Sequence, residues 1–174
     1  MHRRQADLEI FLQPGEYFAS GGDTRIRTLL GSCVSVTIWH PELRVGAMSH
    51  FLLAERVRRH TDGAPDGRYA DEGMMLMIRD LAALDVPVAG CVAKVFGGGD
   101  MFPANTFAGS VGRSNVLAAR RMLGALNIPI VSSSVFGSGH RFIIFDIPSG
   151  DVWSRLTTVE SKQLRRVARA GATA

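Results

Sequence analysis

Short runs rich in β-branched and aromatic residues, each ended by glycine or proline, limit what this 174-residue chain can fold into. The clearest run is 33–39, Cys-Val-Ser-Val-Thr-Ile-Trp, which shows a partial two-residue alternation. Gly31-Ser32 separates it from the preceding run, and His40-Pro41 separates it from the next. Further strands are expected at 15–20, 24–30, 44–53, 91–96, 128–135, 141–147 and 152–157.

Two longer segments instead repeat apolar residues at spacings of three and four, which is typical of an amphipathic helix. One helix is expected at 69–84 and a second at 111–126. The stretch 54–68 is polar and contains two glycines and a proline, so it is expected to be a loop. Together these elements predict a strand-rich single domain of the α/β (α+β) class, with the two main helices packed on the sheets.

The chain has the length of one domain with short extensions. We expect a domain at 15–157, a weakly ordered lead-in at 1–14 and a basic helical tail at 158–174. The content of 46% hydrophobic and 21% charged residues is that of a soluble globular protein. We expect no membrane span and no signal peptide, because no apolar run is long enough. Two cysteines are too few for a disulfide framework, so we expect a reducing, cytoplasmic location.

The formal net charge of +4 raises the question of a nucleic-acid partner. The basic residues gather in short stretches near the N-terminus, in the loop at 54–68 and in the tail, and not along one aromatic-rich stripe. No nucleic-acid-binding motif accompanies them. We therefore expect no nucleic-acid partner, and an acidic protein surface is the better match.

Cys33 is a candidate nucleophile because it follows the Gly31-Ser32 break and opens a strand. Backbone N–H groups at such a break can point at one spot, as an oxyanion hole requires. His50 lies in the next expected strand, and a hairpin centred near residue 41.5 sets Cys33 opposite about residue 50. The alternative is that Cys33 packs as a small hydrophobic residue and His50 bonds a neighbour at a strand end. No set of three or four side chains has metal-ligand spacing, so we expect no metal and no cofactor.

A second motif, Phe-Gly-Gly-Gly-Asp-Met-Phe at 96–102, follows an expected strand. It matches neither the Walker phosphate loop nor the dinucleotide fingerprint. One interpretation is a wide turn that allows the backbone a close approach. The other is a substrate-binding rim, formed by Gly98 and Gly99 with Met101 and Phe102 as apolar contacts.

With these motifs in place, the chain resembles the chemoreceptor glutamine deamidase family, CheD. The resemblance rests on five blocks in register: TLLGSCVSV at 28–36, GAMSHFLL at 46–53, RYAD at 68–71, KVFGGGDMF at 94–102 and VGRSNV at 111–116. It extends over about residues 15–157. It implies a fold like that of bacterial deamidating toxins, with Cys–His chemistry.

The resemblance implies a role for particular residues. It makes Cys33 the nucleophile, His50 the base and Thr28 the nearest match to the family's threonine. The expected substrate-binding residues are Ser32, through its backbone, and the glycine-rich loop. The substrates would be glutamine side chains of methyl-accepting chemotaxis receptors, and a CheC-type phosphatase is a possible partner. The alternatives are another thiol hydrolase, such as a receptor methylesterase or small-molecule amidase, and a non-catalytic module that regulates such a phosphatase.

Overall fold

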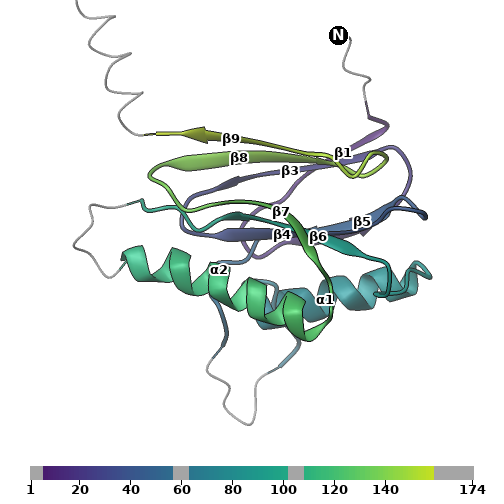
Figure 1. Cartoon of the computed structure of the whole chain (residues 1–174), viewed down its shortest axis with the longest axis horizontal. Coiled ribbons are helices and arrows are strands. Elements are labelled where there is room, and N and C mark those ends of the chain that lie inside the picture. Colours follow the sequence, from purple (N-terminus) through teal and green to yellow (C-terminus); the bar gives the residue numbers. More distant parts are fainter. Residues whose placement is uncertain (1–5, 57–62, 102–107, 159–174) are drawn as a thin grey trace, which may run out of the picture.

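The structure is a computed structural model that describes residues 6–56, 63–101 and 108–158. Within these residues, two β-sheets and a layer of two helices stack in three layers (Figure 1). The elements are β1 Leu8–Phe11, β2 Tyr17–Ser20, β3 Thr24–Leu30, β4 Val34–His40, β5 Val45–Ser49, α1 Ala70–Ala83, β6 Val92–Gly97, α2 Ala108–Ala125, β7 Ile130–Val135, β8 His140–Asp146 and β9 Val152–Thr157. The prediction of a single strand-rich α/β domain with two helices is confirmed.

The outer sheet has the strand order β1-β3-β8-β9, and the inner sheet has the order β2-β5-β4-β6-β7. The pairs β1–β3 and β6–β7 are parallel, and the other pairs are antiparallel. Both helices cover the face of the inner sheet that points away from the outer sheet (Figure 1). The outer and inner sheets thus form a sandwich that is closed by helices on one side only.

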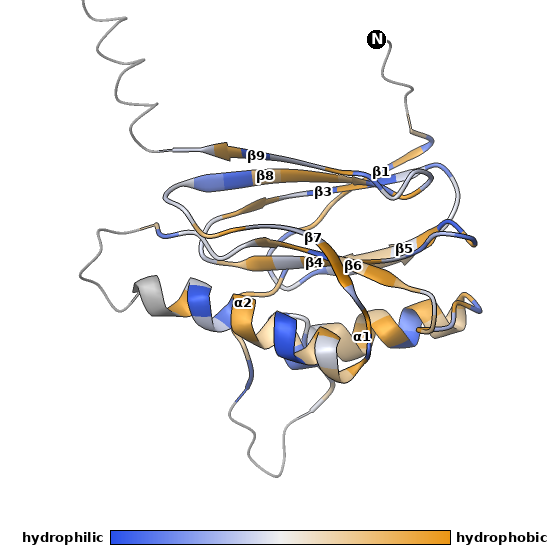
Figure 2. Cartoon of the chain, viewed as in Figure 1, coloured by the Kyte–Doolittle hydropathy of each residue, from blue (hydrophilic) through white to orange (hydrophobic). Residues whose placement is uncertain are grey.

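Alternation along β4 divides its side chains between two hydrophobic cores. Val34, Val36 and Ile38 belong to the core between the inner sheet and the helices. The core between the two sheets contains Leu30, Phe96 and six other buried residues, with Cys33 packed against it. Both helices change between hydrophobic and hydrophilic positions along their length (Figure 2), as expected when one helix face is covered. The inner sheet is therefore buried on both faces, so that even the polar residues Ser35 and Thr37 of its central strand β4 are buried.

The chain termini differ in part from the sequence expectations. Leu8–Phe11 lies inside the expected lead-in at 1–14, yet it forms β1 and pairs in parallel with β3. This strand is too short to be recognised by periodicity, and its partner lies 16 residues further along the chain. The tail expected at 158–174 lies outside the described residues, apart from Thr158. No helix in the described part of the chain is long and apolar enough to cross a membrane.

Candidate active site

The candidate site lies at one end of the sandwich and is formed by Thr28, Cys33 and His50. All three side chains are on strand faces that point into the space between the two sheets. Thr28 belongs to β3 and is fully buried, with the inward-facing parity of its neighbours Ile26 and Leu30. Cys33 lies in the turn between β3 and β4 and is partly exposed. His50 directly follows β5 and is only 2% exposed. Thr28 therefore comes from a strand of the outer sheet, whereas Cys33 and His50 flank strands of the inner sheet.

The pairing of β4 with β5 sets the relation between Cys33 and His50. Thr37 lies opposite Met48, and Val34 lies opposite Phe51 with two hydrogen bonds of 3.0 Å. By the same register, Cys33 lies opposite Leu52, so the predicted pairing of Cys33 with residue 50 was wrong by two positions.

The shift arises from the turn between these two strands, which spans residues 41–44. Its last residue, Arg44, has a left-handed backbone and donates its N–H to the His40 carbonyl. A shift of two positions preserves the face on which each side chain lies. Cys33 and His50 are therefore diagonal neighbours on one face of the inner sheet.

A hydrogen-bond relay determines which nitrogen of the His50 ring carries the proton. The Thr28 hydroxyl donates to the Leu12 carbonyl at 2.7 Å and lies 2.8 Å from His50 Nδ1. A hydroxyl has one proton and a carbonyl can only accept, so Thr28 must accept a hydrogen bond from Nδ1–H. Nε2 of the neutral ring then carries a lone pair, and it is buried with no hydrogen-bond partner among the described residues. Nε2 is therefore available as a base.

The electrostatic surroundings favour the neutral forms of both reactive groups. Burial lowers the pKa of His50 to about 4, although the Leu12 carbonyl and the charge of Glu16 act in the opposite direction. Burial also raises the pKa of the Cys33 thiol, opposed by its own backbone N–H. Both shifts disfavour a thiolate–imidazolium ion pair in the resting enzyme. The arrangement suits a general base that takes the thiol proton during attack.

The glycine-rich loop supports the backbone of the turn that carries Cys33. Gly98 N–H donates to the Cys33 carbonyl at 2.8 Å, and Gly99 N–H donates to the Gly31 carbonyl at 2.9 Å. Gly97 has a φ of +105°, and a Cβ there would overlap the Cys33 carbonyl oxygen. The close-approach interpretation of this motif is thus observed directly. A substrate-binding role for Gly98 and Gly99 stays a prediction.

Two of the remaining predicted binding residues, Met101 and Ser32, lie at the same turn. Met101 lies against Gly31, where an added Cβ would come within 2.9 Å of the Met101 sulfur. Phe102 lies outside the described residues. Among the described residues, the N–H groups of Ser32 and Cys33 donate to no backbone carbonyl, and the Cys33 N–H lies near its own sulfur. These two groups are the candidate donors to an oxyanion.

Comparison with known proteins identifies the family of this chain. The family model described as CheD chemotactic sensory transduction matches residues 52–156. The chain belongs to the CheD family.

Three curated CheD relatives illustrate the similarity. "Probable chemoreceptor glutamine deamidase CheD 2" of Albidiferax ferrireducens is 51% identical over 156 residues, covering 88% of this chain and 90% of the relative. "Probable chemoreceptor glutamine deamidase CheD" of Pseudomonas syringae pv. syringae is 43% identical, covering 89% and 88%. The protein named CheD 3 from Dechloromonas aromatica is 43% identical, covering 83% and 85%. The alignment with the Albidiferax ferrireducens relative covers 88% of this chain. The uncovered part is too short to extend from the N-terminus to Thr28, so Thr28, Cys33 and His50 lie within the aligned region.

Sequence reasoning missed two contributors to this CheD site. The Leu12 carbonyl ends the relay, but a backbone group in an irregular segment leaves no pattern in a sequence. Asn115 belongs to the VGRSNV block and is 1% exposed, and its Nδ2 donates to the Leu52 carbonyl at 2.7 Å. An asparagine on the apolar face of a predicted helix is the signal that would have revealed it.

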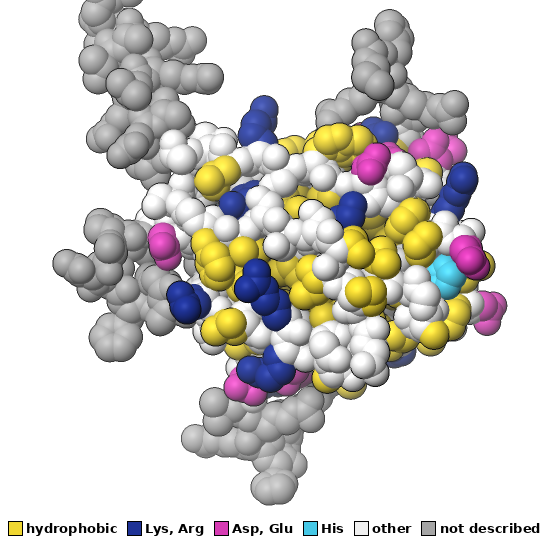
Figure 3. All heavy atoms as spheres, viewed as in Figure 1, with side chains coloured by type: hydrophobic (Ala, Val, Ile, Leu, Met, Phe, Trp, Pro, Cys, Tyr) yellow, Lys and Arg dark blue, Asp and Glu magenta, His cyan; other side chains and the backbone are white. Residues whose placement is uncertain are grey.

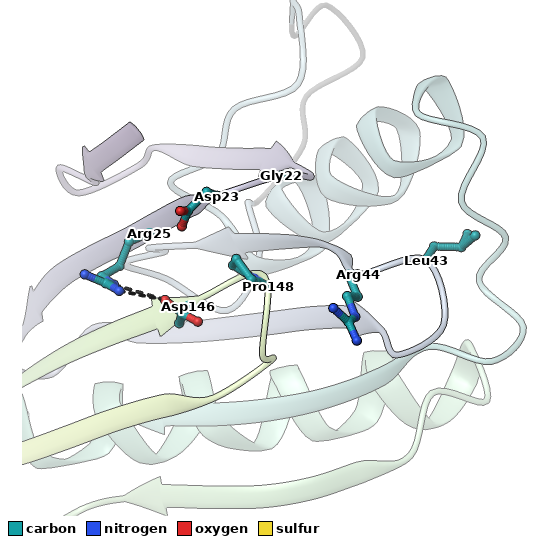
Figure 4. Close-up of a pocket in the computed structure, with 7 residues that line it drawn as sticks. All are labelled: Gly22, Asp23, Arg25, Leu43, Arg44, Asp146 and Pro148. Atoms are coloured by element: carbon teal, nitrogen blue, oxygen red, sulfur yellow. Dashed lines mark hydrogen bonds and ion pairs between the residues drawn. The ribbon is translucent and has the colours of Figure 1, made fainter. Parts of the chain in front are cut away.

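A cavity at the opposite end of the CheD sandwich is separate from these residues. It is lined by Gly22, Asp23, Arg25, Leu43, Arg44, Asp146 and Pro148, where three interstrand turns meet (Figure 4). The ion pair between Arg25 and Asp146, at 2.9 Å, closes one wall. Lys and Arg side chains are scattered among hydrophobic ones on the face in Figure 3, without a basic stripe. No three His, Cys, Asp or Glu side chains gather as metal ligands within the described ranges.

Proposed function

We propose that this protein is a protein-glutamine deamidase that converts glutamine side chains of chemotaxis receptors to glutamate and releases ammonia. The observation that carries the proposal is the Leu12–Thr28–His50 relay, which leaves an unprotonated Nε2 on the sheet face of Cys33. The names of the CheD relatives supply the substrate class.

The first half of the reaction forms a thioester. His50 Nε2 takes the proton of the Cys33 thiol as the sulfur attacks the carboxamide carbon of the glutamine. The developing oxyanion accepts hydrogen bonds from the N–H groups at Ser32 and Cys33. Nδ1–H keeps its bond to Thr28, so the ring stays oriented while it is protonated. His50 then gives the proton to the departing nitrogen, and ammonia leaves.

The second half of the reaction hydrolyses the thioester. His50 Nε2 takes a proton from a water molecule, which attacks the thioester carbon. The proton then returns to the Cys33 sulfur as the glutamate is released. Each turnover adds one negative charge to the receptor, which changes the local electrostatics of its surface. Because this chemistry needs a free thiol and a receptor's signalling surface, we place the protein in the cytoplasm, with a CheC-type phosphatase as a possible further partner.

Mass spectrometry of a purified receptor cytoplasmic fragment tests the proposal. Incubation with the wild-type protein should replace NH2 by OH at specific glutamines, with a matching amount of ammonia. Cys33→Ala should abolish both signals while keeping the fold. Cys91→Ala is the matched control, because it removes the other thiol, which is 2% exposed and bonded to the Pro87 carbonyl.

The outcomes separate the rival activities. Methanol release from methylated receptor without ammonia would indicate a methylesterase. A Cys33→Ala variant that deamidates the receptor at the wild-type rate would refute the nucleophile. A protein that modifies no receptor residue, yet alters the activity of a CheC-type phosphatase equally with and without Cys33, would be a binding module.

A further inference from the structure

Asn115 connects the two chain segments that flank the candidate nucleophile. Its Nδ2 lies 2.7 Å from the Leu52 carbonyl and makes a longer contact of 3.4 Å with the Ser32 carbonyl. Ser32 precedes Cys33, and Leu52 is the residue opposite Cys33 in the strand register. The amide must face these two oxygens through its nitrogen, because its own oxygen would repel both of them.

The β-ladder explains why these two carbonyls need a side-chain donor. Hydrogen-bonded pairs alternate along antiparallel strands, so the pair after Val34 and Phe51 would be Ser32 and Leu53. Instead, Leu53 N–H donates to the Arg68 carbonyl at 3.1 Å, and the Leu53 carbonyl accepts from Ala70 N–H at 2.9 Å. The chain leaves the ladder at Leu52, which deprives the Ser32 N–H and carbonyl of strand partners. Asn115 Nδ2 donates to the Ser32 carbonyl. The Ser32 N–H donates to no backbone carbonyl among the described residues.

Close packing of α2 against the glycine-rich loop places Asn115 at this position. A Cβ on Gly112 would lie 2.7 Å from the Gly98 carbonyl oxygen, and a Cβ on Gly98 would lie 2.6 Å from a methyl of Val116. Gly112, Asn115 and Val116 share one helix face by their spacing of three and four. The two glycines thus let the helix approach closely enough for Asn115 to reach the strand ends.

One feature of Asn115 is unfavourable for stability alone. Its Oδ1 is buried and has no hydrogen-bond partner among the described residues. A buried amide oxygen without a donor loses its hydration and gains nothing in return. Asn115 therefore carries a desolvation cost that its hydrogen bonds to the Leu52 and Ser32 carbonyls must offset.

We propose that Asn115 is a positioning residue for acyl transfer, which keeps the Ser32–Cys33 backbone in the geometry that stabilises the oxyanion. Its hydrogen bonds to the Leu52 and Ser32 carbonyls replace the missing β-ladder pair of Ser32 with Leu53. The Ser32 N–H is thereby kept in the orientation in which it can donate to the oxyanion of the substrate. Asn115 itself touches neither the thiol nor the imidazole in this role. The proposal rests on the deamidase function, since only an acyl transfer develops an oxyanion.

Two reactions of the same thiol distinguish this role from a purely structural one. Deamidation of a receptor fragment passes through an oxyanion, whereas alkylation by iodoacetamide displaces iodide at a methylene carbon and forms none. In Asn115→Ala and Asn115→Asp, kcat should fall about 10- to 100-fold, less than the roughly 100- to 1,000-fold cost of removing an oxyanion donor, because the Ser32 N–H is displaced and not removed. The rate and pH profile of Cys33 alkylation should match the wild type. His50→Asn should slow both reactions, because both need the base.

Trp39→Phe is the matched control for a loss of stability. It removes one side-chain bond to a carbonyl, from Trp39 Nε1 to Ile147 at 2.9 Å, far from Cys33 along β4. This variant should keep its kcat even if its melting temperature falls as far as that of Asn115→Ala.

Wild-type kcat in either folded Asn115 variant would overturn the proposal. Equal losses of deamidation and alkylation, or failure of both variants to fold, would also overturn it, since Asn115 would then serve the fold. If the wild-type protein alkylates normally but deamidates no receptor glutamine, the deamidase proposal fails, and the role of Asn115 falls with it.

Discussion

The burial of His50 predicts a specific loss of stability in mild acid. In an unfolded chain, the imidazole takes up a proton as the pH falls through 6.5, whereas in the folded protein its pKa is about 4. Between these two values, the unfolded state binds more protons than the folded state. The free energy of unfolding must therefore fall as the pH falls from about 7 towards 4. No such penalty exists above pH 7, where the ring is neutral in both states.

The size of this effect follows from the two pKa values. Each unit of difference corresponds to about 1.4 kcal/mol, so the full penalty below pH 4 is about 3 kcal/mol. Between pH 7 and pH 5, the share expected from one such group is about 2 kcal/mol. With a urea m-value of about 2 kcal/mol per molar, this corresponds to a midpoint shift of about 1 M.

The assay compares urea unfolding of the wild-type protein and His50→Asn at pH 7 and pH 5. All other titrating groups are shared, so the difference between the two proteins isolates His50. The wild type should lose about 2 kcal/mol more than His50→Asn on acidification. Equal losses would refute the idea that His50 is buried in its neutral form. The same pKa predicts that kcat/KM of the wild type keeps its value down to about pH 5, because the free enzyme's base stays unprotonated.

Three further substitutions test individual contacts. Thr28→Val removes the acceptor for the Nδ1–H of His50 and should lower kcat about 10- to 100-fold. Thr28→Ser keeps a hydroxyl and should keep most of the activity. Equal kcat values for these two variants would exclude the relay. Cys91→Ala should keep full activity and lose about 1 kcal/mol of stability, and iodoacetamide should label Cys33 first; preferential labelling of Cys91 in the folded protein would contradict both assignments. Gly97→Ala should cost about 1–3 kcal/mol through its positive φ alone and should also lower kcat by displacing the Cys33 carbonyl; a fully active, stable variant would contradict the described loop.

The local elements of this protein follow from its sequence because their causes are local. The spacing of apolar residues predicted both helices, and it did so because one face of each helix must be buried against a sheet. The β-branched runs between glycine and proline turns predicted most strands for a similar reason. The Gly31-Ser32 break and the parity of residue 50 were also enough to nominate Cys33 and His50, since a shift of two positions does not change the face of a strand.

Local sequence patterns do not predict contacts between segments that lie far apart in the chain. Only the tertiary structure revealed that Leu8–Phe11 is a strand, because its stability depends on pairing with β3. Only the packing of the outer sheet on the inner sheet brings Thr28 and the Leu12 carbonyl to His50, and this contact decides which ring nitrogen is left without a proton. The chain separates from β4 at Leu52 because the N–H groups of Leu52 and Leu53 donate to the distant Arg68 carbonyl. The Ser32 carbonyl then accepts from Asn115 and not from a neighbouring strand. A sequence names the groups that can react, but their protonation and orientation are set by neighbours brought together only by folding.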